Sequence, residues 1–236
     1  MDDIFPISPI TLGTVQLGFR YGVANRVGQP DVDSSRRILA KALACGVNTW
    51  DTARHYGTAE EVIGDFFRSA YLESMPLVVT KFKWEGSALT DKVEAFRQAR
   101  NRVMESLRHL GIARLPILLF HQDKDQPIRE VLRQLPDVLR TLKEDGLIMH
   151  GGISLYFAHD AEYVVDEPTI QAIQVPLNVL DQRLIATGVL HGFYRERKAV
   201  FIRSVFLQGL FFMEARQLPP TLSGIIPYLK QLGELA

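Results

Sequence analysis

The sequence has 236 residues, of which 47% are hydrophobic and 23% are charged, and its 27 Lys plus Arg residues balance its 27 Asp plus Glu residues. A chain of this length and apolar content can bury one sizeable core, so we expect a single globular domain over residues 1–236. The zero net charge gives no indication of nucleic-acid binding or of a polybasic membrane-binding surface. We therefore expect a small molecule as the partner.

Cysteine content and the start of the chain indicate the compartment. Cys45 is the only cysteine, which excludes an intrachain disulfide framework and a multi-cysteine metal site. Residues 1–6 are acidic and lack a basic region followed by an apolar run, and no stretch of about 18 apolar residues occurs elsewhere. We expect a cytoplasmic protein with no membrane segment and no metal site.

Short β-rich runs alternate with longer amphipathic stretches along the chain. Several of the short runs are apolar along most of their length, as is typical of strands buried on both faces. Strand followed by helix, repeated without hairpins or a flexible linker, predicts a parallel sheet covered by helices. The absence of a topological break favours a TIM-type (β/α) barrel over an open sheet. The candidate strands cover residues 10–15, 47–52, 77–82, 116–121, 148–154, 171–176 and 200–205.

The intervening stretches have helical spacing. Helices are predicted over residues 34–45 and near 226–235. The residues Thr58-Ala59-Glu60-Glu61 predict a capping box that opens a helix over residues 60–68. Pro136 lies inside the predicted helix 128–145, which indicates a kink or two shorter helices.

Four chemically useful side chains follow the ends of the first strands. Asp51, Lys81 and His121 each end a candidate strand, and Tyr56 follows Asp51 by five residues. The active site of a barrel lies at the carboxyl ends of its strands, so these four groups are expected to converge there. Tyrosine is a poor acid at neutral pH unless an ammonium stabilises its phenolate, and such a lysine needs a carboxylate to orient it. The set predicts proton transfer to a carbonyl oxygen, whereas His55 is interpreted as an exposed loop histidine.

These residues also resemble a known family. Asp51-Thr-Ala-x-x-Tyr56-Gly, with strands that end on Thr80-Lys81 and Phe120-His121, looks like the aldo-keto reductase family, whose fold is a (β/α)8 barrel that binds NADPH or NADH. The resemblance implies an oxidoreductase that reduces an aldehyde or ketone to an alcohol by hydride transfer. It also implies Tyr56 as the general acid, Lys81 paired with Asp51 to lower the tyrosine pKa from about 10, and His121 to orient the carbonyl.

The same resemblance implies a cofactor site. Residues 11–18, 152–154 and 202–209 are similar to the family's first, fifth and seventh strands. Ser154 and Gln174 match the positions that hold the nicotinamide carboxamide, while Leu155 replaces the family's asparagine, so one contact is missing or replaced. The residues expected to bind NADPH or NADH are Thr14, Asp51, Ser154, Gln174, Arg203, Ser204 and Phe206.

The end of the sequence departs from the family pattern. After Gly209 there are 27 residues and no eighth strand is predicted, so about seven of the eight βα units are present and the domain looks truncated at its C-terminus. In the family, the eighth unit carries the glycine-rich turn and basic residues that hold the adenosine phosphate. Strands one and seven would keep unpaired edges, which a longer chain, a partner or an oligomer could close.

Three classes of function stay open. A reductase is favoured by the complete set of four side chains, and a non-catalytic or regulatory reductase-like module with weak cofactor binding by the absent eighth unit. A cofactor-free barrel isomerase or lyase could also use Tyr56 and Lys81. The polar segment 121–125 suits a hydroxylated carbonyl compound, and residues 16–25 resemble reductases of bacterial sugar and cell-surface polysaccharide metabolism. Sugar-like aldehydes are therefore the expected substrates.

Overall fold

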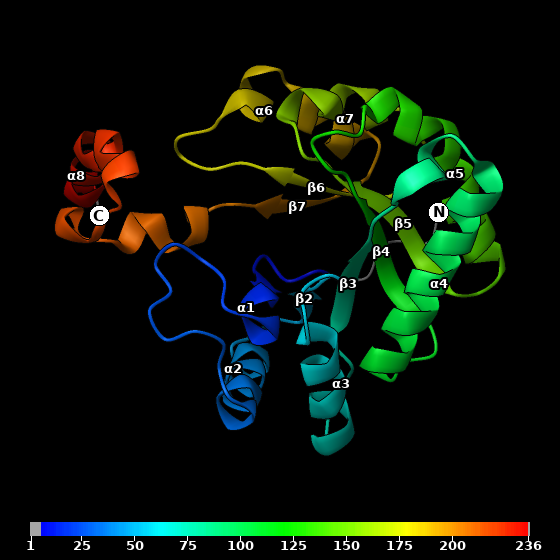
Figure 1. Ribbon diagram of the computed structural model, residues 1–236, viewed down its shortest axis with the longest axis horizontal. Coiled ribbons are helices and arrows are strands. Elements are labelled where there is room, and N and C mark those ends of the chain that lie inside the picture. Colours follow the sequence, from blue (N-terminus) through cyan, green and yellow to red (C-terminus); the bar gives the residue numbers. More distant parts are fainter. Residues whose placement is uncertain (1–5, 236) are drawn as a thin grey trace.

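The computed structural model describes residues 6–235. Figure 1 shows a strongly curved sheet with helices α2 to α5 along its outer side, and helix α8 on the opposite side of the picture from α4 and α5. The strands are β1 Thr11–Gly13, β2 Thr49–Asp51, β3 Leu77–Phe82, β4 Leu115–His121, β5 Ile148–Ser154, β6 Ala172–Pro176 and β7 Ala199–Arg203. The α-helices are α1 Val15–Gly18, α2 Val32–Ala44, α3 Ala59–Ser69, α4 Lys92–Leu110, α5 Ile128–Glu144, α6 Arg183–Ala186, α7 Val189–Arg195 and α8 Ile226–Leu235. The 3-10 helices are η1 Gly86–Leu89, η2 Ala158–Val164, η3 Leu207–Phe212, η4 Ala215–Gln217 and η5 Pro220–Ile225.

The seven strands lie side by side in chain order, and every neighbouring pair is parallel. This order, with helices on the outer side, confirms the predicted TIM-type barrel and its seven βα units. Within residues 6–235, β1 and β7 each pair with one strand only, so the barrel is open between these two strands. No helix in this range is both long and apolar enough to cross a membrane.

Alternate residues of each strand face opposite sides of the sheet, which explains why the strands are apolar throughout. The side chains on one side of the sheet, from β3, β4, β6 and β7, form a cluster in the interior of the barrel. The other set packs against the helices in a larger cluster that includes Val78, Leu118 and Ile153. The interior set consists of Leu77, Val79, Ile117, Leu119, Ala172 and Phe201.

Helix α3 begins as predicted, but the predicted capping box at Thr58 is wrong. The Thr58 side chain caps no backbone N–H of the helix. Its hydroxyl donates to the carbonyl of Gly18 and accepts from the amide of Gln29, at 3.3 and 3.0 Å. The Thr58 hydroxyl thus bonds to other segments of the chain, and Glu61, the acid of the predicted box, contacts His109 Nδ1 at 3.0 Å.

Helix α5 differs from expectation in another way. It runs from Ile128 to Glu144 as one helix with Pro136 inside, so the alternative of two shorter helices is wrong. Proline removes one hydrogen bond of the helix. The apolar face of α5, including Leu135 and Leu139, is buried on both sides of the proline, and this packing holds the helix together.

A close backbone approach joins α1 to the loop that carries Tyr56. A Cβ atom on Gly18 would overlap the carbonyl oxygen of Tyr56. Gly57, with a φ of +56°, lies in the left-handed region that favours glycine, and a side chain there would meet the carbonyl of Gly18. The amide of Thr58 also donates to the Gly18 carbonyl at 3.4 Å. The two glycines therefore set the height of the Tyr56 loop over the barrel.

We expect Gly18→Ala to lower the free energy of unfolding by about 2 kcal/mol, because the added methyl group forces the two backbones apart. Gly13→Ala is the matched control: a Cβ atom there meets no atom within 4 Å, so its effect should stay within about 0.5 kcal/mol. Urea denaturation of both variants measures the difference. Equal stability of the two variants would contradict the close approach.

Candidate active site

The polar groups at the barrel mouth continue the interior rows of the strands. Lys81 lies two residues beyond Val79 and His121 two beyond Leu119, so both have the parity of the apolar interior. Strand register places His121 opposite Ser154, and Ser154 opposite Gln174. Asp51 ends β2. Side chains from five neighbouring strands, β2 to β6, thus share the carboxyl-end face of the barrel.

Lys81 and Asp51 form an ion pair at the centre of this face. The Lys81 side chain is completely buried, and its Nζ donates to Asp51 Oδ1 at 2.6 Å and to the carbonyl of Thr52 at 2.8 Å. Thr14 fixes the other side of Asp51, because its backbone N–H and its hydroxyl both donate to the Asp51 carbonyl at 2.9 Å. A buried ammonium needs such partners to stay charged. The lysine is therefore held in one orientation.

Tyr56 lies in the loop between β2 and α3, next to this ion pair. Lys81 Nζ is 4.9 Å from the centroid of the Tyr56 ring. Burial of the phenol raises the pKa of Tyr56 above 10, and the positive charge of Lys81, which acts in the opposite direction, does not fully offset it. The expectation of a lowered tyrosine pKa is thus wrong in its net direction. The phenol keeps its proton at neutral pH.

His55 and His121 are packed together at the mouth. Their ring centroids are 4.6 Å apart, and the His55 ring also lies 4.9 Å from that of Tyr56. His55 is exposed at the rim, as expected of a loop histidine, yet it bridges the two predicted site residues. In the sequence, the only signal for this contact of His55 with Tyr56 and His121 was that His55 directly precedes Tyr56.

Both histidines are neutral at neutral pH. Burial lowers the pKa of His121 to about 2, and the charge of Lys81 acts in the same direction. His55 is exposed as a residue, but loss of solvent where its ring packs on Tyr56 and His121 lowers its pKa to about 4, together with the positive charge of Lys83. The Nδ1 of His121 has no hydrogen-bond partner within residues 6–235.

Ser154 and Gln174 extend the network to the next strands. Ser154 Oγ donates to Gln174 Oε1 at 3.0 Å, and Gln174 Nε2 donates to Asp51 Oδ1 at 2.9 Å. The same Asp51 oxygen thus accepts from Lys81 and Gln174. Leu155, at the position where the family resemblance leads us to expect asparagine, packs its side chain into the helix-facing core. It offers no polar group to a ligand.

The predicted residues at the end of β7 divide into two groups. Arg203 lies in the mouth, where its Nη2 donates to the carbonyl of Leu155 at 2.8 Å and its Nη1 donates to Ser204 Oγ at 3.3 Å. Burial lowers the pKa of Arg203, and the negative charge of Tyr56 in its ionised form acts in the opposite direction. Phe206 is 56% exposed and packs on Phe212, with 5.2 Å between the centroids. It lies outside the hydrogen-bonded group.

A polar cavity adjoins the mouth. It has a volume of about 350 Å³, and His55 forms part of its wall. Charged groups of both signs surround it, so it suits a polar ligand better than an apolar one. Its lining residues are Arg54, His55, Lys83, Glu85, Arg102, Glu105 and His109.

Comparison with known proteins agrees with this architecture. The D-arabinose 1-dehydrogenase of Saccharomyces cerevisiae is 27% identical over 207 residues, which are 83% of this chain and 58% of the yeast protein. Among solved structures, the glycerol dehydrogenase of Gluconobacter oxydans has a TM-score of 0.70 at 22% identity, over 99% of this chain and 76% of that chain. An aldo-keto reductase of Klebsiella pneumoniae in complex with NADPH has a TM-score of 0.64 at 20% identity, over 88% and 69% of the two chains.

The chain spans 39% to 58% of the length of the first curated relatives that it matches. The sequence model of the aldo/keto reductase family matches residues 9–221, which include every predicted site residue. The two solved structures show the same fold. Together with the mouth geometry, the match over residues 9–221 establishes that the chain belongs to the aldo/keto reductase family.

Proposed function

We propose that this protein is an oxidoreductase that reduces the carbonyl group of an aldehyde or ketone to an alcohol with NADPH or NADH. The observation that carries the proposal is the contact of Asp51, Lys81 and Tyr56 at the barrel mouth. The Tyr56 phenol keeps its proton and can donate it. The positive charge of the neighbouring Lys81 ammonium then stabilises the phenolate that forms. Family membership supports the same class of reaction.

The residues of the mouth fit a nicotinamide carboxamide. Ser154 and Gln174 carry hydroxyl and amide groups side by side, and after their mutual contacts Gln174 Nε2 has a second hydrogen and Ser154 Oγ has free lone pairs. A carboxamide presents one acceptor and one donor group, which this pair can match. Arg203 and Ser204 lie at the next strand end, where they would line the rest of the cofactor. When bound, the nicotinamide supplies the hydride.

Lys81 has one donor left for the reaction. Its ammonium carries three hydrogens, and the contacts with Asp51 and Thr52 use two of them. The third is available to the Tyr56 oxygen as the proton leaves for the substrate. Asp51 holds the Lys81 ammonium through its hydrogen bond, and Thr14 and Gln174 keep Asp51 in place. The proton therefore moves from a phenol whose conjugate base is stabilised where it forms.

His121 acts as a neutral group in this scheme. With a pKa of about 2 it cannot serve as a cationic acid at neutral pH. A neutral imidazole still has one N–H donor, which can bind the substrate carbonyl oxygen and orient it toward Tyr56.

The substrate that we propose is a hydroxylated, sugar-like aldehyde. The charged and polar lining of the adjoining cavity supports this choice, since each hydroxyl needs a hydrogen-bond partner. The activity named for the yeast relative, D-arabinose 1-dehydrogenase, concerns a sugar. A panel of sugar-like and simple aromatic aldehydes tests the idea, and turnover of the aromatic compounds alone would refute it. We place the activity in the cytoplasm.

A reductase-like module without catalysis is the second candidate. The unpaired edges of β1 and β7 within residues 6–235 favour it, because an open barrel holds a cofactor less firmly. We propose that a longer chain or a second copy closes this gap in the active form. Titration with NADPH and NADH, followed by the fluorescence of the reduced nicotinamide, separates the two candidates, because only the reductase requires tight binding.

Tyr56→Phe should lower kcat for carbonyl reduction by about 10²- to 10⁴-fold, because it removes the proton donor. Binding of NADPH, measured by fluorescence titration, should remain nearly unchanged, since the variant loses a single oxygen atom. Tyr71→Phe is the control, because Tyr71 is 96% exposed and lies just after the C-terminal end of α3. Unchanged turnover in Tyr56→Phe would refute the assignment of the acid.

The lowered pKa of His121 also predicts a pH dependence of stability. Between the unfolded value of about 6.5 and the folded value of about 2, the unfolded chain binds more protons, so stability falls as the pH falls below 6.5. His121→Gln should reduce the stability lost between pH 7 and pH 5, by up to about 1.4 kcal/mol per pH unit. Urea denaturation at several pH values measures this. The control is His191→Gln, because His191 is exposed. An equal change of stability with pH in the wild-type protein and both variants would contradict a neutral, half-buried His121.

A further inference from the structure

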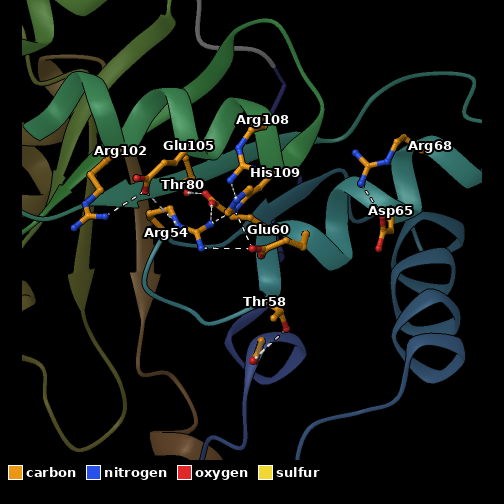
Figure 2. Close-up of polar contacts among 12 residues, drawn as sticks. Arg54, Thr58, Glu60, Asp65, Arg68, Thr80, Arg102, Glu105, Arg108 and His109 are labelled. Atoms are coloured by element: carbon orange, nitrogen blue, oxygen red, sulfur yellow. Dashed lines mark hydrogen bonds and ion pairs between the residues drawn. The ribbon is translucent and has the colours of Figure 1, made fainter.

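A buried carboxylate lies behind the Tyr56 loop. Glu60 is the second residue of α3, and its side chain has no exposed surface. Its Oε1 accepts from Thr80 Oγ1 at 2.6 Å, and its Oε2 accepts from Arg54 Nη1. Figure 2 shows these three side chains converging from the Tyr56 loop, α3 and β3. Both carboxylate oxygens are thus satisfied, one of them by an arginine.

Arg54 connects this carboxylate to the active site. It lies between Asp51 and Tyr56, and its backbone N–H donates to the carbonyl of Lys81 at 3.0 Å. Its guanidinium also contacts Nδ1 of His109 and lies 3.9 Å from Glu105, both on α4. The side chain is only 18% exposed. Arg54 therefore ties one turn of the loop to two helices and to β3.

The Arg54 to Glu60 ion pair closes a short loop that contains Tyr56. On either side of the tyrosine, the Tyr56 amide donates to the Ala53 carbonyl at 2.9 Å and the Tyr56 carbonyl accepts from Ala59 at 3.1 Å. Adjacent residues of β3 hold the loop on opposite faces of the sheet. Lys81 points to the interior beneath the tyrosine ring, and Thr80 points outward to Glu60. The position of the ring over Lys81 thus depends on the ion pair behind it.

Stability alone does not explain a charged pair at this site. Replacing a buried ion pair by apolar residues of similar volume is often neutral or stabilising. The planar guanidinium and the carboxylate instead fix the orientation of the chain segments that carry them, because their hydrogen bonds are short and depend strongly on geometry. We propose that Arg54 and Glu60 are positioning residues that hold the Tyr56 loop so that the phenol stays over Lys81. This inference rests on the proposed carbonyl reduction for its effect on turnover.

The test compares Arg54→Met, Arg54→Lys and Glu60→Gln with the control Arg68→Met. Arg68 pairs with Asp65 at 2.6 Å on the same helix, but both side chains are more than half exposed, and Figure 2 shows this pair apart from the Arg54 contacts. Glu60→Gln keeps the shape of the side chain, removes its charge and replaces one acceptor oxygen with an NH2 donor. Arg54→Lys keeps the charge and removes the planar fork.

Arg54→Met and Glu60→Gln should lower kcat about 100-fold, because a displaced proton donor slows the reaction without leaving the site. The KM for NADPH should stay within about twofold, since neither residue faces the proposed cofactor site, and Arg54→Lys should recover part of the loss. Arg54 also lines the polar cavity and Glu60 does not, so an equal loss of kcat in Glu60→Gln separates loop positioning from substrate contact. In the same two variants, amide hydrogen exchange of residues 53–59 should become faster while that of α5 does not change. Arg68→Met should resemble the wild-type protein in every measurement.

Two results overturn the proposal. The first is normal kcat and normal exchange of residues 53–59 in both variants. The second is faster exchange in α5 to the same degree as in residues 53–59, which would assign the pair to overall stability. If Arg54→Met does not fold, Glu60→Gln and Arg54→Lys provide the same comparison. If the wild-type protein reduces no carbonyl compound while local exchange changes as expected, the proposed function fails and the positioning of the loop stands.

Discussion

The buried ammonium of Lys81 is the interaction on which the active-site face depends. A charge without contact with water is costly unless its hydrogen-bond partners are complete. Asp51 Oδ1 and the carbonyl of Thr52 supply two of these partners. Thr14 and Gln174 in turn fix Asp51. Strands β1, β2, β3 and β6 must therefore be in register before the lysine can be buried, so the site and the fold form together.

Burial then decides the protonation state of the neighbouring groups. The same loss of solvent that raises the pKa of Tyr56 lowers that of His121, because in each case the charged form is disfavoured. The mouth contains a neutral phenol and a neutral imidazole beside a fixed ammonium. In the reduction that we propose, the phenol is the group that carries the transferable proton, and the ammonium stabilises the charge that remains after transfer.

The loop that carries Tyr56 is held from both sides. Gly18 and Gly57 allow α1 to approach its backbone, and the Arg54 to Glu60 pair holds it to α3 and β3. The local pattern at this helix start predicted other contacts, because Thr58 and Glu61 match a capping box that the structure does not form. The carboxylate of the buried Glu60 pairs with Arg54, which precedes the helix, and no local rule for helix ends includes such a partner. The continuous helix through Pro136 has the same origin, since packing of its apolar face outweighs one lost hydrogen bond.

The sequence by itself determined the order of the strands and helices, the barrel, and the placement of Asp51, Lys81 and His121 at strand ends, because hydrophobic periodicity and strand parity are local properties. Only the tertiary structure decided which hydroxyls and carboxylates meet, the packing of His55 between Tyr56 and His121, and the direction of the Tyr56 pKa shift. These depend on distances between segments far apart in the chain and on the solvent that their packing excludes. A sequence pattern contains neither quantity.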